Sequence, residues 1–119
     1  MDRRILVVDD DMINRKLLNV LLKKNGYTDV IEAENGKEAL AMIQAEPMDM
    51  ILLDIIMPEM NGLDLLKILK QDEKFKNIPV AILTTDDSKK TEALNLGACA
   101  VLIKPIKEPD LKNILAQNL

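Results

Sequence analysis

The 119-residue sequence contains no histidine, one cysteine and only two aromatic side chains, Tyr27 and Phe75. Without histidine, and with Cys99 as its single thiol, the chain can form neither a Cys/His zinc site nor an internal disulfide. Two aromatic rings are too few for a surface on which nucleic-acid bases stack. Because Cys99 lies among small and aliphatic residues, we expect it to be a packing residue rather than a reactive thiol.

The sequence also lacks an excess of positive charge and any long apolar run. Its net charge is −4 and its pI is near 4.8, so its surface has no general attraction for nucleic acid or anionic lipid. No apolar stretch is long enough to span a bilayer, and no signal peptide is recognisable. The length and the 48% hydrophobic content are typical of one globular domain, residues 1–119. We therefore expect a cytoplasmic protein with no direct nucleic-acid binding and no membrane insertion.

Short apolar runs alternate with amphipathic segments five times along the chain. Strands are expected at residues 5–8, 30–33, 50–54, 79–83 and 101–103, with 30–33 as an edge strand. Helices are expected at 12–25, from Gly36 to before Pro47, at 63–69, from a cap at Asp87 or Ser88 to Leu96, and from Pro109 onward. Strands that alternate with helices imply right-handed crossovers and a parallel sheet covered on both faces. The predicted fold class is therefore α/β, doubly wound.

Polar residues stand where the apolar runs end. Asp9 and Asp10 follow the first run, Asp54 ends the third, Thr84 follows the fourth and Lys104 follows the fifth. Parallel strands end at one edge of a sheet, and ligands bind at that edge in open α/β folds. We therefore expect these five side chains to meet at one cleft, although they are far apart in sequence.

The chemistry of this set favours a metal ion and a phosphoryl group. Carboxylates crowded in a small site repel one another, so a hard cation must neutralise them or some must protonate. Mg²⁺ is favoured over Ca²⁺ because so few carboxylates leave room for water and a phosphate oxygen, with Asp9 and Asp10 holding the ion and Asp54 sharing it. Lys104 and the Thr84 hydroxyl suit the charge on a phosphoryl group. Asp54 is then a candidate oxygen nucleophile that forms an acyl phosphate.

Simpler roles exist for some of these residues. Asp54 could cap the following turn, or it could pair with Lys104 as a buried ion pair beside a solvated acidic cap. We disfavour the pair because burying it costs desolvation on both partners. Asp11 is expected to cap the helix at 12–25 and is not counted in the site.

Four motifs, in order and spacing, resemble the receiver domain of two-component response regulators over essentially the full length. They are Val7-Val8-Asp9-Asp10, Leu53-Asp54-Ile55-Ile56-Met57-Pro58 with Gly62, Leu83-Thr84, and Ile103-Lys104-Pro105. The resemblance implies a flavodoxin-like (βα)5 fold with strand order 2-1-3-4-5. It also implies that Asp54 accepts a phosphoryl group, with Mg²⁺, from a phosphohistidine on a sensor histidine kinase or histidine phosphotransfer protein.

Further expectations follow from the resemblance alone. The backbone carbonyl of Ile56 completes the metal shell, and the Lys104–Pro105 peptide is a candidate for a cis bond. The module catalyses only its own phosphorylation and dephosphorylation and is otherwise no enzyme. Phosphorylation switches a face formed by the fourth helix, fifth strand and fifth helix, which an unknown downstream protein reads.

The sequence departs from the family at several positions. Val101 and Ile106 stand where aromatic residues are frequent, so the usual aromatic rotamer toggle is not expected, while movement of Thr84 and its loop toward the phosphate is. Ile56 and Asp86 occupy positions that resemble those tuning how long the phosphoryl group persists. Asn14-Arg15-Lys16-Leu17 resembles receivers attached to hybrid kinases, and both a stand-alone regulator and a domain of a larger protein are expected forms.

Three other functions compete with this interpretation. A haloacid-dehalogenase-type phosphatase has an Asp-x-Asp pattern that Asp9 and Asp11 imitate, but the expected Thr and a cap domain are missing. A flavodoxin would need a phosphate loop where three acids stand. A phosphorylation-independent interaction module would not need the intact acidic site.

Overall fold

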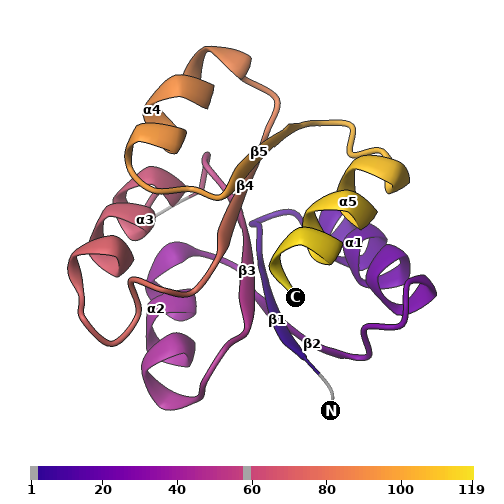
Figure 1. The fold of residues 1–119 in the computed structure, drawn as a ribbon, viewed down its shortest axis with the longest axis horizontal. Coiled ribbons are helices and arrows are strands. Elements are labelled where there is room, and N and C mark those ends of the chain that lie inside the picture. The colour runs from indigo at the N-terminus through magenta and orange to yellow at the C-terminus, as the bar shows by residue number, and fades with distance from the viewer. Residues whose placement is uncertain (1–2, 58–59) are drawn as a thin grey trace.

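The computed structural model describes residues 3–57 and 60–119, so Pro58 of the receiver-like motif lies outside that part. Its strands are β1 (Arg4–Val8), β2 (Asp29–Ala33), β3 (Met50–Asp54), β4 (Val80–Thr84) and β5 (Ala100–Ile103). They form one parallel sheet in the order β2-β1-β3-β4-β5 (Figure 1). The predicted strand order 2-1-3-4-5 is therefore confirmed.

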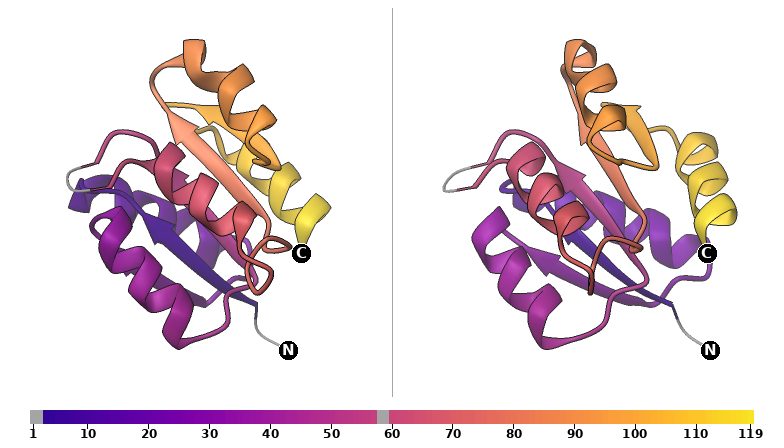
Figure 2. Two further views of the ribbon diagram at one scale, coloured as in Figure 1. Left: turned by 90° about the vertical axis from the view of Figure 1, so that its left-hand side faces the viewer. Right: turned by 60° about the vertical axis from the view of Figure 1, so that its left-hand side comes forward.

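The helices of the described part are α1 (Met12–Lys24), α2 (Gly36–Ala45), α3 (Gly62–Gln71), α4 (Lys90–Asn95) and α5 (Glu108–Asn118), with a 3-10 turn, η1 (Asp87–Lys89), before α4. Figures 1 and 2 show α1 and α5 on one face of the sheet and α2, α3 and α4 on the other. The doubly wound architecture thus follows the alternation of strands and helices in the sequence.

Alternate residues of the strands pack against the two helical layers, as the pleat requires. In β3, Met50 and Leu52 belong to the core beneath α1 and α5, while Ile51 and Leu53 belong to the core beneath α2, α3 and α4. The three inner strands are almost wholly buried, whereas β2 and β5 are half-exposed at the edges. The predicted edge position of residues 30–33 is confirmed.

The register of the strands brings their carboxyl ends to the same edge of the sheet. Val8 of β1 pairs with Leu53 of β3, so Asp9 and Asp54 are the next residues after this pair on two neighbouring strands. Thr84 pairs with Ile103, which places Lys104 just beyond the end of β4. Hydrophobic pairing of the strands thus fixes which polar residues share the carboxyl edge.

Most local expectations are confirmed, with two corrections. Asp11 caps α1, since its side chain accepts from the N–H of Ile13 at 2.9 Å, and the Lys104–Pro105 peptide is cis. The cap before α4 is neither Asp87 nor Ser88. The Asp86 side chain accepts from the Ser88 N–H instead, because the chain enters η1 one residue earlier than expected.

The second correction concerns Cys99. It is exposed, so its predicted packing role is wrong, and its neighbour Ala98 is the buried small residue. Phe75, in the polar loop after α3, packs against the core. Within the described ranges, no helix combines the length and apolar character needed to cross a bilayer.

Candidate functional site

The carboxyl edge of the sheet buries charged side chains. Within the described part of the chain, the buried polar or charged residues are Asp9, Asp54 and Thr84, with whole-residue exposures of 2%, 8% and 1%, and Arg15. Three of these four are predicted site residues, and each stands at the end of an inner strand. Asp10 is exposed at the mouth of the site. Folding therefore places charge where an apolar core would otherwise continue, which costs desolvation unless the charge has a partner.

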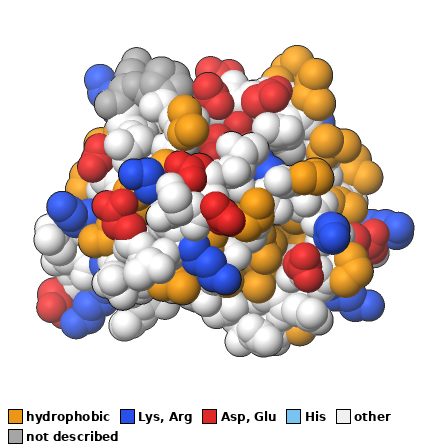
Figure 3. All heavy atoms as spheres, turned by 90° about the horizontal axis from the view of Figure 1, so that it is seen from above, with side chains coloured by type: hydrophobic (Ala, Val, Ile, Leu, Met, Phe, Trp, Pro, Cys, Tyr) orange, Lys and Arg blue, Asp and Glu red, His pale blue; other side chains and the backbone are white. Residues whose placement is uncertain are grey.

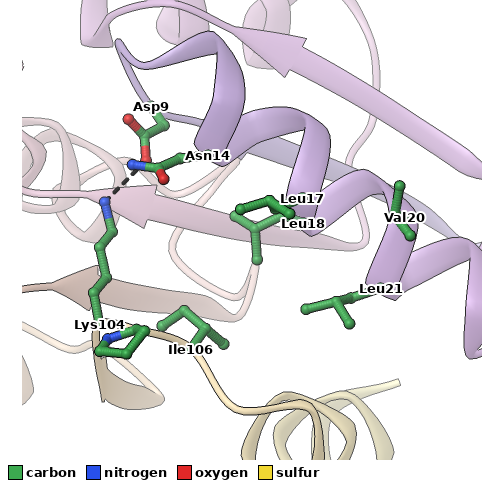
Figure 4. A pocket seen from close by; sticks show the side chains of 9 residues that line it. Asp9, Asn14, Leu17, Leu18, Val20, Leu21, Lys104 and Ile106 are labelled. Atoms are coloured by element: carbon green, nitrogen blue, oxygen red, sulfur yellow. Dashed lines mark hydrogen bonds and ion pairs between the residues drawn. The ribbon is translucent and has the colours of Figure 1, made fainter.

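Lys104 supplies positive charge to this edge from the loop after β5. Its Nζ lies 3.0 Å from Oδ2 of Asp9 and 3.4 Å from Oδ1 of Asp54, and the lysine side chain is 16% exposed. Figure 4 shows the lysine extended toward Asp9, with the hydrogen bond between them drawn. The predicted approach of Lys104 to Asp54 is thus found, and Asp9 is an additional and nearer partner.

Both aspartates and Thr84 also bond to backbone N–H groups of their own loops. Asp9 Oδ1 accepts from the N–H of Asp11 at 2.9 Å, and Asp54 Oδ1 accepts from the N–H of Ile55 at 2.9 Å. Thr84 Oγ1 accepts from the N–H of Asp86 at 3.0 Å. Since the Thr84 oxygen is used as an acceptor, its hydroxyl proton can be donated to a ligand. Asp54 thus accepts from the N–H of the residue that follows it while facing a cation and another acid.

The electrostatics of the site oppose ionisation of Asp54. Burial raises the pKa of Asp54, the nearby Asp9 raises it further, and Lys104 only partly offsets the two. For Lys104, burial lowers the pKa, but its contacts with Asp9 and Asp54 outweigh burial and leave the pKa raised. The lysine is therefore a permanent cation at neutral pH, while the two acids still lack a second positive charge.

The acidic side chains have the chemistry of a site for a hard divalent cation. One carboxylate oxygen from each of Asp9, Asp10 and Asp54 can be chosen so that all lie within 4.8 Å of one another. So small a set of oxygen donors leaves coordination positions for water and a phosphate oxygen, which suits Mg²⁺. The residues present therefore fit the predicted ion. The part of the Ile56 carbonyl as a further ligand stays a prediction.

Gly62, at the start of α3, lies against the backbone of Asp54. A Cβ at position 62 would be 2.1 Å from the Asp54 carbonyl oxygen, a distance that no side chain tolerates. The N–H of Gly62 donates to the carbonyl of Ile55 at 2.8 Å. The glycine of the predicted motif is thus required because the chain returns directly behind Asp54.

An apolar groove of about 260 Å³ lies beside the acidic site, and Asp9 and Lys104 form its polar end. Leu17, Leu18 and Leu21 of α1 line one side, and Pro105 and Ile106 line the other. Figure 3 looks onto the carboxyl edge, where acidic side chains gather near the middle and hydrophobic ones lie over α1. Ile13, Leu17 and Val20 are about 60% exposed or more, so only part of the apolar pattern of α1 faces the core.

Comparison with known proteins decides the family. Residues 5–116 match the family described as the response regulator receiver domain. The chain belongs to this family. The sequence resemblance to receivers is confirmed.

Individual relatives agree with this assignment. Chemotaxis protein CheY1 of Helicobacter pylori is 40% identical over 115 residues, 94% of this chain and 93% of the relative. The sensor kinase/phosphatase CqsS of Vibrio cholerae is 37% identical over 118 residues, 97% of this chain but 17% of that protein. Among solved structures, Vibrio cholerae CheY4 has a TM-score of 0.89 at 33% identity with full coverage of both chains.

The structure of TrrA from Thermotoga maritima has a TM-score of 0.90 at 32% identity, covers 98% of this chain and 99% of that one, and is a complex with Mg²⁺ and BeF. Receivers are phosphoacceptor modules of two-component signalling that bind Mg²⁺ at an acidic pocket, and Asp9, Asp10 and Asp54 form such a pocket here. The predicted cofactor, Mg²⁺, is thus confirmed. Neither the phosphatase nor the phosphorylation-independent module is favoured.

Sequence reasoning missed two residues next to the site, Arg15 and Glu32. Arg15 is 7% exposed and donates from Nη1 to the backbone carbonyl of Asp9 at 2.8 Å. One signal was present, because Arg15 stands on the buried stripe of α1 with Leu18 and Leu22 at helical spacing. No pattern in the sequence connected Glu32 to Arg15 or to the acidic site.

Proposed function

We propose that Asp54 is the phosphoacceptor of this receiver, and that its donor is a phosphohistidine on a sensor histidine kinase or a histidine phosphotransfer protein. The observation that supports this is the position of Asp54, buried at the end of the central strand and 3.4 Å from the Lys104 amine beside two further acids. Receivers take phosphoryl groups from sensor kinases. Asp9 shares the burial, the cation and the acid cluster, but both of its carboxylate oxygens accept hydrogen bonds, whereas among the described residues none is donated to Oδ2 of Asp54.

In the reaction, a carboxylate oxygen of Asp54 forms a bond to phosphorus while the bond from phosphorus to the donor imidazole nitrogen breaks. The electron pair of that bond leaves with the imidazole, so the product is an acyl phosphate on Asp54 and a free histidine. Lys104 stands where it can pair with a phosphoryl oxygen, and its raised pKa keeps it charged. The chain is thus a reactant that promotes its own phosphorylation and hydrolysis rather than a turnover enzyme.

Asp9, Asp10, Asp54 and the Ile56 carbonyl are the proposed metal ligands. Bound Mg²⁺ would supply the positive charge that the acids lack and offset the charge of the incoming phosphoryl group. Asp9 is already oriented for this, since both of its carboxylate oxygens are held by hydrogen bonds, one from Asp11 and one from Lys104.

Thr84 is the proposed link to the output surface. In the proposed switch the β4–η1 loop moves toward Asp54 and the Thr84 hydroxyl donates to a phosphoryl oxygen, so the phosphoryl group stabilises the moved arrangement. The proposed readout is the face of α4, β5 and α5, where Leu94 and Ile103 are exposed at 41% each. Val101 is half-buried against the core, so we assign the switch to Thr84 and its loop rather than to an aromatic toggle.

Acetyl phosphate with MgCl₂ provides the direct test, read by intact mass. Wild-type protein should gain one phosphoryl group, and Asp54→Asn should gain none because its amide cannot attack phosphorus. Asp49→Asn, which changes an acid at the opposite end of the same strand, is the matched control and should be phosphorylated like the wild type. An adduct on Asp54→Asn equal to that of the wild type would refute the assignment.

Thr84→Ala separates phosphorylation from the switch. The variant should still be phosphorylated, with a rate within about tenfold of the wild type, because the nucleophile and Lys104 are intact. The chemical-shift changes of α4 and β5 amides that phosphorylation causes in the wild type should be largely lost. If Thr84→Ala abolished phosphorylation itself, our division of roles would be wrong.

We take residues 1–119 as one receiver domain, acting in the cytoplasm through a protein target that recognises its phosphorylated form. The similarity to both CheY1 and the much longer CqsS is compatible with a separate protein and with a part of a larger one.

A further inference from the structure

Arg15 is the buried charged residue of the described chain that the proposed chemistry leaves unused. A buried guanidinium costs desolvation, and an apolar side chain on the core stripe of α1 would serve stability as well or better. Its position beside the acidic site therefore calls for a reason other than packing.

The contacts of Arg15 run in two directions. Nη1 donates to the carbonyl oxygen of Asp9 at 2.8 Å, and Nε donates to Oε1 of Glu32 on β2 at 3.1 Å. Arg15 Nη2 also lies 3.9 Å from the exposed carboxylate of Glu34. A planar guanidinium can make such diverging bonds at once, whereas an ammonium group concentrates its donors at one point.

The carbonyl that Arg15 holds belongs to the peptide group joining Asp9 to Asp10. Because that group is planar, a hydrogen bond to its oxygen fixes the orientation of the backbone on both sides. The N–H of Asp9 donates to the carbonyl of Ala33 at 3.2 Å, so β2 holds this short loop twice, once directly and once through Glu32 and Arg15.

Glu32 is itself held in place by α1. Its Oε2 accepts from Lys16 at 2.9 Å and from Asn19 at 3.3 Å, in addition to the Arg15 bond at Oε1. The contact with Lys16, together with those of Arg15 and Asn19, lowers the pKa of Glu32 despite its partial burial, so it is ionised at neutral pH. The acid thus keeps the guanidinium aimed at the Asp9 carbonyl.

We propose that Arg15, held by Glu32, is a positioning residue for Mg²⁺: it fixes the peptide between Asp9 and Asp10 so that both carboxylates face the ion before it binds. The inference rests on the proposed metal ligands. It assigns part of the metal affinity to residues that do not touch the metal.

The test measures Mg²⁺ affinity without phosphorylation, by titrating the amide NMR spectrum of the full chain with MgCl₂. Arg15→Met should weaken binding about tenfold, in the range known for outer-shell partners of metal ligands. Arg15→Lys and Glu32→Gln, which keep more of the packing, should weaken binding roughly threefold. Lys23→Met is the matched control, because Lys23 is an exposed lysine of the same helix that makes no hydrogen bond with Arg15, Glu32 or Asp9 within the described residues, and it should bind like the wild type.

Thermal unfolding in EDTA, run on the same variants, separates positioning from stability. If Arg15→Met lowers the melting temperature but keeps the Mg²⁺ affinity within about twofold of the wild type, Arg15 contributes to stability only and the proposal fails. If Arg15→Met does not fold, Arg15→Lys and Glu32→Gln decide by the same criterion. A wild-type chain that binds no Mg²⁺ would overturn the metal assignment as well, whereas normal wild-type binding with unaffected variants would overturn this inference alone.

Discussion

The two ends of the sheet hold similar charged groups in opposite circumstances. At the amino end, Arg4 pairs with Asp29 at 3.1 Å and with Glu46 at 2.8 Å, with its side chain about one-third exposed (32%). Its backbone N–H also donates to Asp49 at 2.7 Å. At the carboxyl end, Lys104 pairs with Asp9 and Asp54, whose side chains are only 2% and 11% exposed.

The difference shows what distinguishes a structural ion cluster from a reactive one. The amino-end charges keep contact with water, so they cost little to assemble and contribute little to stability. The carboxyl-end acids are desolvated, crowded and short of positive charge, which leaves Asp54 with a raised pKa. A bound cation would relieve that unfavourable arrangement, and the proposed phosphorylation of Asp54 would take place there.

The largest expected difference comes from removing the cation at each end. Lys104→Met should lower the free energy of unfolding by about 3 kcal/mol in EDTA at neutral pH, because it leaves buried carboxylates without their amine. Arg4→Met should cost about 0.5 kcal/mol, since water replaces the lost contacts. Urea denaturation measures both, and added Mg²⁺ should restore part of the loss in Lys104→Met. Equal losses of unfolding free energy in Lys104→Met and Arg4→Met would contradict the proposed difference between the two ends of the sheet.

A glycine-to-alanine change at each end tests backbone crowding rather than charge. Gly62→Ala should destabilise by about 2 kcal/mol, because the new methyl group meets the Asp54 carbonyl and one of the two segments must shift. Gly26 lies in the loop between α1 and the start of β2, at the amino edge of the sheet. It has φ of +93° and open space around it, so Gly26→Ala should lower the free energy of unfolding by about 1 kcal/mol from backbone conformation alone. Thermal melts rank the two variants. A smaller loss of stability in Gly62→Ala than in Gly26→Ala would mean that the backbone behind Asp54 shifts at little cost.

The smallest effect should have the opposite sign. Folding raises the pKa of Asp54, so the native state binds this proton more tightly than the unfolded state, and stability is lost as pH rises from the ordinary value of 3.8 through the raised one. Asp54→Asn should therefore stabilise the metal-free protein by about 1 kcal/mol at neutral pH. The gain should disappear as the pH falls toward 3.8, where the wild-type carboxyl is neutral as well.

Asp29→Asn is the control at the amino end. It should change the free energy of unfolding by less than about 0.5 kcal/mol, since the side chains of Asp29 and its partner Arg4 are each about one-third exposed to water. Urea titrations of both variants at several pH values provide the comparison. A destabilised Asp54→Asn at neutral pH would show that the Lys104 pair outweighs the cost of burying Asp54.

Much of this molecule could be predicted from sequence because its strands and helices have strong periodic patterns. Apolar runs such as Ile5–Val8 and Met50–Leu53 define buried strands, and the polar residue after each run is placed by the end of the strand. Local errors arose where short segments depended on neighbours. Asp86 rather than Asp87 caps η1, and Cys99 turned out to face solvent at the sheet edge.

By itself, the sequence determined the fold class, the edge at which the polar residues meet and the kinds of ligand they suit, because these follow from periodicity, strand ends and side-chain chemistry. Only the tertiary structure decided that Lys104 reaches Asp9 across 95 positions of sequence, that Asp9 is buried while Asp10 is exposed, and that Arg15 holds the peptide between them. Strand register and side-chain conformation set these partnerships, and both are fixed by packing between segments that no local pattern connects.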